Sequence, residues 1–297
     1  MNQSPSLPLR GALFMVLAGV CFATANAITY VITAHLHFRP QSDTFWQYGI
    51  ALMFSLPFVL RHGLAGLKTA HPLLHIARVI VSALGVQAFV ISLSLGLPIW
   101  QVIALVMTAP LFVLTGAALI LKETVTPARW IAAAVGFGGA MVVSELWTTG
   151  LTQATLYPVA AALLWGAASL MTKYLTRTEA APTVTLWLLV LLTPINAGLS
   201  LQAGFELPSQ AILIWLLIAG VTMMAAQYLL TWSYAAADAA FVQPFDDLKL
   251  VSNIVIYGLA FGYWPSGNIW LGTAMILGAS AYLLLARGGR QAAALPA

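Results

Sequence analysis

Three ionisable residues lie close together inside an otherwise apolar segment. Asp246, Asp247 and Lys249 are the only charged residues in the stretch 239–261. A charge at bilayer depth costs ~2.5–3.5 kcal/mol on insertion scales, so it requires a partner or a function. Asp246 and Lys249, three residues apart, share one helix face as a predicted ion pair, whereas Asp247 points elsewhere. The trio either lines a substrate route, with Asp246 or Asp247 carrying a proton, or forms a pair plus an acid near the cytoplasmic mouth.

Uncharged amides form the second group of candidate binding residues, because an amide can bond both a carboxylate and an ammonium. Inside the membrane their hydrogen bonds must be met by other helices, by water or by substrate. Bonding between helices is the commoner outcome. We select Asn26, Gln87 and Gln227 as substrate-binding candidates. The amides in apolar segments are Asn26, Gln47, Gln87, Gln101, Gln227 and Asn253.

Aromatic residues form the third group. Trp165 is predicted to be a cavity wall, because the adjacent Gly166 leaves room against its ring, and Trp46 and Tyr228 are further substrate-binding candidates. Ordinary packing is the competing explanation for each. An aromatic, mostly neutral site fits an amphipathic small molecule, since a phosphate ester would require several basic residues at depth. The tryptophans predicted at span ends, as an interfacial belt, are Trp100, Trp147, Trp264 and Trp270.

The elements that position these residues follow from composition. Hydrophobic residues make up 61% of the 297 and charged residues 7%, against roughly 25% charged in soluble domains. Lipid must therefore be the solvent for most of the surface. One cysteine excludes a disulfide framework, and the spacing of His71 and His75, without an acidic third ligand nearby, favours a solvated loop over a metal site.

Apolar runs of about 20 residues predict membrane-spanning helices. The charge-free stretch 79–121 is too long for one span and is expected to break at Gly96-Leu97-Pro98. Pro110, Pro194 and Pro244 are expected to kink or interrupt their helices. The ten predicted spans are 11–34, 44–60, two within 79–121, 128–146, 156–175, 181–202, 209–234, 239–261 and 268–286.

Basic residues predict the orientation. With ten spans both termini lie on one side, and Arg39 is the only Lys or Arg on the other side. The positive-inside rule then predicts cytoplasmic termini in a multi-pass protein of the cell (inner) membrane. The basic residues assigned to the cytoplasmic side are Arg10, Arg61, Lys68, Arg78, Lys122, Arg129, Lys173, Arg177, Arg287 and Arg290.

The two halves of the chain resemble each other in register. Gln87 pairs with Gln227 at an offset of 140 residues, and Trp130 pairs with Trp270 at the same offset. The prediction is an all-α membrane protein of ten helices in two inverted five-helix repeats, residues 10–146 and 147–287, with cytoplasmic tails 1–9 and 288–297. Inverted repeats are typical of alternating access, with substrate near the midplane. A cleaved signal peptide is the competing interpretation of the first span, but the repeat requires that helix.

Several short motifs resemble a known family. Thr108-Ala109-Pro110-Leu111-Phe112, then Leu121-Lys122-Glu123 and Trp130, recur in its first repeat, and Gln243-Pro244-Phe245-Asp246-Asp247-Leu248 takes the place of an Ala-Pro-Phe-Glu-Tyr-like stretch. Across residues 10–287 the chain resembles the EamA-type branch of the drug/metabolite transporter superfamily, and is most similar there to YddG-type aromatic amino-acid exporters. It departs from the pattern at Tyr263, where Glu123 would recur, and at Asp246-Asp247.

The resemblance implies a secondary transporter or facilitator that exports small organic metabolites, with aromatic and other neutral amino acids as the expected cargo. Efflux of cationic drugs is an alternative, favoured by the excess of one acid over Lys249. A membrane-embedded enzyme is the alternative from another class, and missing nucleophile, metal and nucleotide-binding motifs count against it. The expected partners are a small-molecule substrate and the lipid bilayer, with no cofactor, no nucleic acid and no obligate protein partner.

Overall fold

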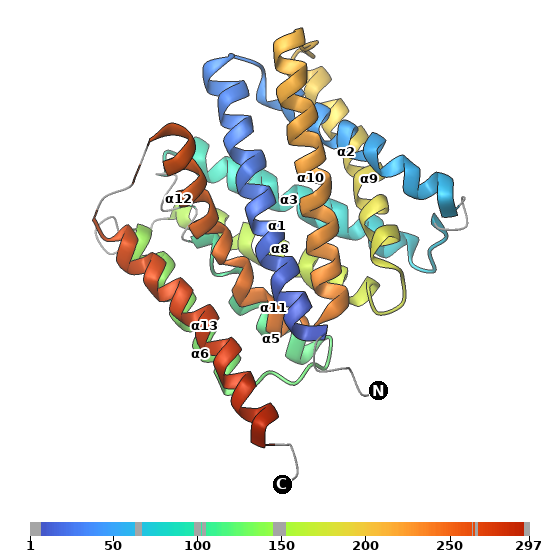
Figure 1. Ribbon diagram of the computed structural model, residues 1–297. Helices are drawn as coiled ribbons and strands as arrows, with labels where there is room; N and C mark the ends of the chain where they lie inside the picture. The colour runs from blue at the N-terminus through green and yellow to red at the C-terminus, as the bar shows by residue number, and fades with distance from the viewer. Residues whose placement is uncertain are drawn as a thin grey trace.

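The computed structural model describes residues 7–62, 67–97, 102, 105–144, 153–262, 264 and 267–293. Within these residues all regular secondary structure is helical, and there is no strand (Figure 1). Some residues singled out from the sequence lie outside this part of the chain: Pro98, Trp100, Gln101, Trp147 and Tyr263.

Proline opens several helices of the first half. A proline at the first helical position removes an N–H that would have no partner there, and it begins α2, α3 and α6. The break expected after α3 is present, with Gly96 in the left-handed region at φ 83°. The elements of this half are α1 (Leu7–Tyr30), the π-helix η1 (Val31–His35), α2 (Pro40–His62), α3 (Pro72–Ser94), α5 (Ala109–Leu119) and α6 (Pro127–Ser144).

Two spans of the second half, 156–175 and 181–202, coincide with the helices α8 and α9. Pro194 lies inside α9 without ending it. The elements of this half are η3 (Gln153–Thr155), α8 (Leu156–Leu175), α9 (Ala181–Gln202), α10 (Gln210–Ala236), α11 (Ala239–Asp246), α12 (Leu248–Phe261) and α13 (Ile269–Ala293).

The predicted span 239–261 is divided into α11 and α12, which meet at Asp247. Pro244 lies inside α11, three residues before the break, and it weakens this helix because it has no N–H to bond the carbonyl four residues earlier. Gly262, at φ 67°, ends α12 with a left-handed residue that is favourable for glycine. The interruption places an acidic residue at the break of a helix.

Five helical stretches of the described residues are long and apolar enough to cross a membrane. Shorter apolar helices cover Ala109–Leu119 and Trp270–Leu283. α1 begins at Leu7 and α13 continues to Ala293, so parts of the predicted tails are helical. The five stretches are Pro8–His35, Pro72–Ser92, Gln153–Leu175, Ala181–Gln202 and Gln210–Ala236.

Helices from the two halves pack against each other in matching pairs. α1 lies along α10 and α3 lies along α8, while α2 packs on α9 and α6 runs beside α13 (Figure 1). α1 also contacts α12, and α5 contacts α8 in the corresponding way. The start of α1 and the end of α13 lie at the same end of the molecule (Figure 1).

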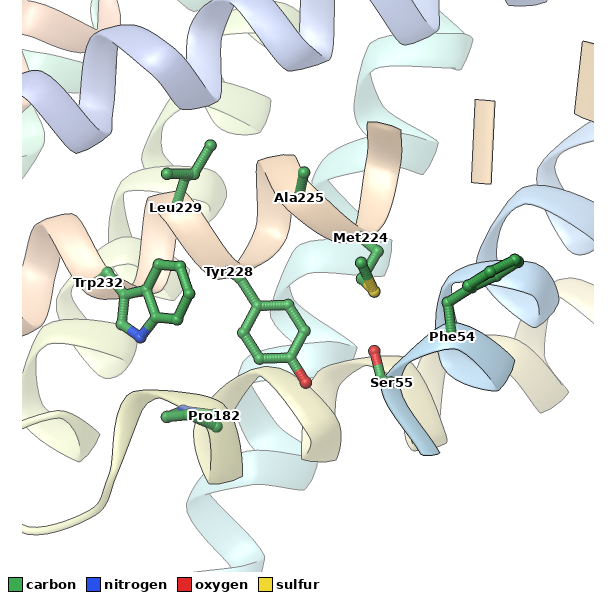
Figure 2. Close-up of a pocket in the computed structure, with 8 residues that line it drawn as sticks. All are labelled: Phe54, Ser55, Pro182, Met224, Ala225, Tyr228, Leu229 and Trp232. Carbon is green, nitrogen blue, oxygen red and sulfur yellow. The ribbon is translucent and has the colours of Figure 1, made fainter. Parts of the chain in front are cut away.

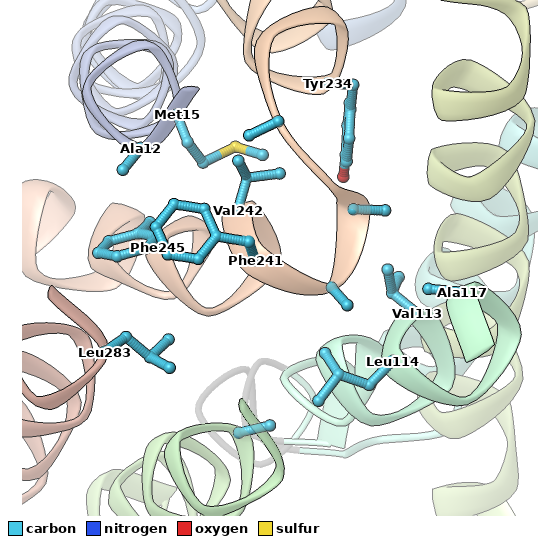
Figure 3. Close-up of a cluster of buried hydrophobic side chains, with 14 of the residues drawn as sticks. Ala12, Met15, Val113, Leu114, Ala117, Tyr234, Phe241, Val242, Phe245 and Leu283 are labelled. Carbon is cyan, nitrogen blue, oxygen red and sulfur yellow. The ribbon is translucent and has the colours of Figure 1, made fainter. Parts of the chain in front are cut away.

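The short helix α11 lies in the largest apolar core of the described residues (Figure 3). Phe241, Val242 and Phe245 are almost completely buried there, beside Met15 of α1 and Leu114 of α5. Burial of large apolar side chains stabilises this helix, which is too short to be stable alone. α11 therefore fixes where α12 begins.

Candidate substrate site between α1 and α12

The predicted ion pair is present at the start of α12. Lys249 Nζ donates to Asp246 Oδ2 at 2.7 Å, and the Lys249 and Asp246 side chains are 43% and 19% exposed. Lys249 also faces α1, since a Cβ on Gly19 would lie 3.2 Å from the Lys249 Cβ. The pair is thus partly open and lies against α1.

Asp247 points in another direction, as its position in the helix predicts. It is 4% exposed, and a Cβ added to Gly136 of α6 would lie 2.9 Å from its Oδ2. Gly136 therefore makes room for the carboxylate. The structure separates the two acids: Asp246 pairs with Lys249, and Asp247 faces α6.

Amides extend the polar surface along α12 from Lys249. Asn253 Nδ2 donates to the Lys249 carbonyl at 2.7 Å, and Asn26 Nδ2 of α1 donates to Asn253 Oδ1 at 3.3 Å. Tyr257 Oη donates to the Asn26 carbonyl at 3.3 Å. We call Asp246, Lys249, Asn253, Tyr257 and Asn26 the polar strip. Its α12 members, Lys249, Asn253 and Tyr257, recur every four residues, so they share one helix face.

Aromatic rings surround the end of the polar strip at Tyr257. Tyr30 of α1 lies 5.8 Å from Tyr257 and 5.2 Å from Phe261, measured between ring centroids, and His35 is 5.4 Å from Tyr30. Tyr30 is among the exposed aromatic residues. The sequence analysis named Asn253 only as an amide in an apolar segment and did not single out Tyr257, although their spacing of four and eight residues from Lys249 is a usable signal.

Trp165 packs α8 onto α3. Its Nε1 donates to the Ser82 carbonyl at 3.2 Å, and a Cβ on Gly85 would lie 2.6 Å from that nitrogen. Gly166 faces Phe112 of α5. A glycine of another helix, Gly85 of α3, thus makes room for the Trp165 indole, which the sequence argument about Gly166 did not anticipate.

The other candidates lie in separate environments. Gln87 is exposed, whereas Gln227 is 7% exposed and its Nε2 lies 3.9 Å from Met223 Sδ. Trp46 Nε1 donates to the Glu206 carbonyl at 3.3 Å, in the α9–α10 connection. The structure thus brings only Asn26, Asp246 and Lys249 of the predicted substrate-binding residues together.

Tyr228 lines a lateral cavity of about 510 Å³ between α2, α9 and α10 (Figure 2). Its hydroxyl is buried and points toward the Ser55 hydroxyl of α2 (Figure 2). The wall is almost wholly apolar and consists of Phe54, Ser55, Pro182, Met224, Ala225, Tyr228, Leu229 and Trp232.

The prediction of a solvated loop around His75 is wrong. His75 is 0% exposed, its Nε2 lies 2.9 Å from Glu179 Oε2, and its ring stacks on Trp187 at 5.2 Å. Neighbouring Arg78 is also buried and donates to the Val184 carbonyl at 2.8 Å. The partners come from about 100 residues later in the chain, which local sequence cannot reveal. Within the described part of the chain no cluster of three His, Cys, Asp or Glu side chains could hold a metal.

Charged residues bind the helix ends around α11. Glu123 accepts hydrogen bonds from the backbone N–H groups of Ala239 and Ala240, at 3.2 and 3.1 Å. A carboxylate at a helix N-terminus is favourable because of the exposed N–H groups and the helix dipole. Lys173 Nζ donates to the Tyr234 and Ala237 carbonyls at the end of α10, at 2.9 and 2.7 Å.

Two ion pairs complete this group: Arg177–Glu123 at 3.4 Å and Arg129–Asp238 at 3.2 Å. We call Glu123, Lys173, Arg177, Arg129 and Asp238 the ionic clamp. It joins residues of both halves of the chain at the α10–α11 connection.

Comparisons with family models and with solved structures agree on the fold and the family of this chain. The EamA-like transporter family model matches residues 9–145 and again residues 153–285. A solved crystal structure shares the fold with a TM-score of 0.73 at 18% identity, covering 95% of this chain and 97% of that chain.

Curated relatives cover nearly the whole chain. A riboflavin transporter of Rhizobium johnstonii is 54% identical over 96% of this chain and 95% of its own length. A riboflavin transporter of Brucella anthropi is 42% identical, over 91% and 96%. A S-adenosylmethionine uptake transporter of Rickettsia prowazekii is 23% identical, over 93% and 95%.

None of these three relatives is named as an amino-acid exporter, which is the function implied by the resemblance to YddG-type proteins. Their names describe transporters of small molecules and not enzymes. With two matches of the family model and several helices able to span a membrane, the chain is a multi-pass small-molecule transporter that belongs to the EamA-like transporter family.

Proposed function

We propose that the protein is a carrier for riboflavin and that the polar strip between α1 and α12 binds it. The main support is the sequence similarity, over nearly the whole chain, to two proteins named riboflavin transporter. Sequence similarity of this extent favours a shared cargo. The chemistry of the polar strip supports the same choice.

Riboflavin has a planar, uncharged tricyclic ring with carbonyl and N–H groups along one edge, and a chain of hydroxyl groups. The amides of Asn26 and Asn253 each offer a donor and an acceptor to such an edge. The neighbouring rings of Tyr30 and Tyr257 offer faces and edges for aromatic packing. Lys249 and Asp246 offer a donor and an acceptor to hydroxyl groups.

Charge distinguishes riboflavin from its phosphorylated form. The one cation of the polar strip, Lys249, is already paired with Asp246. Phosphate recognition commonly uses arginine forks or several basic groups. The polar strip therefore favours the uncharged flavin over flavin mononucleotide.

Movement of the cargo follows from a proposed inverted repeat, residues 10–146 and 147–287. The double match of the family model supports two copies. The first helix of each copy packs on the third helix of the other, α1 on α10 and α8 on α3, as expected of two copies related by symmetry.

The break at Asp247 supports a midplane site, since discontinuous helices commonly form transporter sites. The positive-inside pattern supports cytoplasmic termini in an inner membrane. The ionic clamp would then hold the cytoplasmic side closed.

Aromatic amino acids are the second candidate cargo. Asp246 and Lys249 could exchange their mutual ion pair for the ammonium and carboxylate of a zwitterion. Cationic drugs are less well matched, because Lys249 neutralises Asp246. Competition experiments separate these cargoes.

The test is uptake of radiolabelled riboflavin by proteoliposomes of the purified protein, with empty liposomes as the control. We expect saturable uptake that excess riboflavin and lumiflavin reduce and flavin mononucleotide does not. Competition by phenylalanine or tryptophan in place of lumiflavin would favour the amino-acid cargo. Absence of saturable uptake by folded, inserted protein would refute the proposal.

A further inference from the structure

Asp43, in the first turn of α2, is an acid buried without a positively charged partner. It is 1% exposed. In the part of the chain that the structure describes, no Lys, Arg or His forms an ion pair with it. The charges nearest to it in the chain are otherwise engaged, since Arg39 donates to the Ala203 carbonyl and pairs with Glu206 at 3.9 Å.

Neutral groups from two helices surround the carboxylate. Gln47 Nε2 donates to Asp43 Oδ2 at 2.8 Å and to Thr29 Oγ1 of α1 at 2.7 Å. The other carboxylate oxygen, Oδ1, is buried without a hydrogen bond of regular geometry among the described residues, and the Thr29 hydroxyl lies within reach of the carboxylate. The arrangement therefore presents an unused carboxylate oxygen beside the Thr29 hydroxyl and the Gln47 amide.

A buried, uncompensated carboxylate is unfavourable because it has lost its hydration without gaining a counter-charge. The positive end of the α2 dipole offsets only part of this penalty. A small cation at Oδ1 neutralises the charge and gives the oxygen a partner. α1 also changes to the π-helix η1 directly after Tyr30, and such π-turns are frequent at functional sites.

Other titratable groups on the surrounding elements have partners of their own. Tyr48 lies beside Gln227, and Tyr30 and His35 pack on each other and on Phe261. Asp247 is another deeply buried acid. It faces Gly136 of α6 and is not part of the Asp43 site.

We propose that Asp43, with Thr29 and Gln47, binds a monovalent cation, H⁺ or Na⁺, and that this cation is coupled to transport. Thr29 lies one helical turn after Asn26 of the polar strip, on the same helix. Cation occupancy at Asp43 thereby fixes the part of α1 that contacts the cargo. The coupling rests on the proposed riboflavin transport, whereas cation binding itself does not.

The binding arm of the test measures thermal unfolding of the purified protein. NaCl is compared with choline chloride at equal ionic strength, and pH is varied without sodium. A ligand that binds only the folded state raises the Tm. For a sodium site we expect a Tm increase with NaCl, lost in Asp43→Asn and kept in the matched variant Glu206→Gln. For a proton site we expect no sodium effect and a pH-dependent Tm difference between wild type and Asp43→Asn.

The transport arm compares riboflavin counterflow with uptake driven by a sodium or proton gradient. Asp43→Asn is expected to keep counterflow and lose gradient-driven uptake, with Glu206→Gln unchanged in both. Thr29→Val provides a second variant if Asp43→Asn does not fold, and it should weaken the cation effect on the Tm.

If the Tm of wild type, Asp43→Asn and Thr29→Val responds identically to cations and pH, the proposed cation site is refuted. Asp43 would then be a structural acid that binds no cation. A cation-dependent Tm without riboflavin transport supports the site and contradicts the proposed cargo. Gradient-driven uptake that survives Asp43→Asn contradicts the coupling.

Discussion

Asn26 of α1 donates a hydrogen bond to Asn253 of α12, 227 residues later in the chain, at 3.3 Å. The contact joins a helix of the first half to a helix of the second. Asn253 in turn bonds the Lys249 carbonyl, so the two amides continue the polar surface that begins at the Asp246–Lys249 pair. A rearrangement of one half against the other must act on this contact.

Removal of an amide from the polar strip should weaken cargo binding. For Asn253→Ala we expect the KM for riboflavin to rise about tenfold, since loss of one to two hydrogen bonds of about 1 kcal/mol each is of that size. The maximal rate should change little. Initial rates of uptake in proteoliposomes measure both, with the exposed residue of α9 in Gln202→Ala as the control. An unchanged KM would remove Asn253 from the site.

Charge at the Asp246–Lys249 pair should control the rejection of phosphate. Asp246→Asn frees the Lys249 cation, so flavin mononucleotide should become a competitor of riboflavin uptake in this variant. Lys249→Gln should not gain this competition, because it adds no positive charge. Inhibition curves with both flavins measure the effect. If flavin mononucleotide competes equally in wild type and Asp246→Asn, then Lys249 does not face the cargo.

Much of the helical framework could be predicted from sequence, because long apolar runs end at charges, glycines and prolines. The spans 156–175 and 181–202 illustrate this, since they coincide with α8 and α9. Pro244 correctly indicated an interruption near Asp247. Local chain chemistry determines these features, so a single sequence contains them.

Contacts between distant helices could not be predicted in the same way. The sequence suggested that the adjacent Gly166 makes room for Trp165, but it could not reveal that Gly85 of α3 also faces this ring. His75 is buried by Glu179 and Trp187, which no local pattern connects to it. Asn26 was selected by its polarity within an apolar run, whereas its partner Asn253 is known only from the packing of α1 on α12.

Asp247, at the α11–α12 break, is the rival of Asp43 as the group that carries a coupling proton. If Asp247 carries the proton, then Asp247→Asn should keep riboflavin exchange and lose any pH-gradient drive, because an amide cannot exchange a proton in this range. Exchange and gradient-driven uptake are measured in the same proteoliposomes. Gly136→Ala is a companion variant, since its Cβ would lie 2.9 Å from the Asp247 carboxylate and should perturb it without removing it. Full pH-driven uptake in Asp247→Asn would assign the proton elsewhere.

Glu123 should stabilise the end of the molecule that holds the ionic clamp. Its side chain is 3% exposed, it accepts hydrogen bonds from two N–H groups at the start of α11, and it pairs with Arg177. Glu123→Gln removes the charge and one acceptor, which should lower stability by about 1–3 kcal/mol, the range for leaving buried polar groups without partners.

The measurement is the Tm of the purified variant, with Glu206→Gln as the control because the Glu206 side chain is 38% exposed and its ion pair with Arg39 is long, at 3.9 Å. Exposed pairs contribute little, so the control Tm should remain near wild type. Loss of the clamp should also speed riboflavin exchange if opening of this end limits it. Equal Tm values for Glu123→Gln and Glu206→Gln would mean that the clamp contributes no more than a surface ion pair.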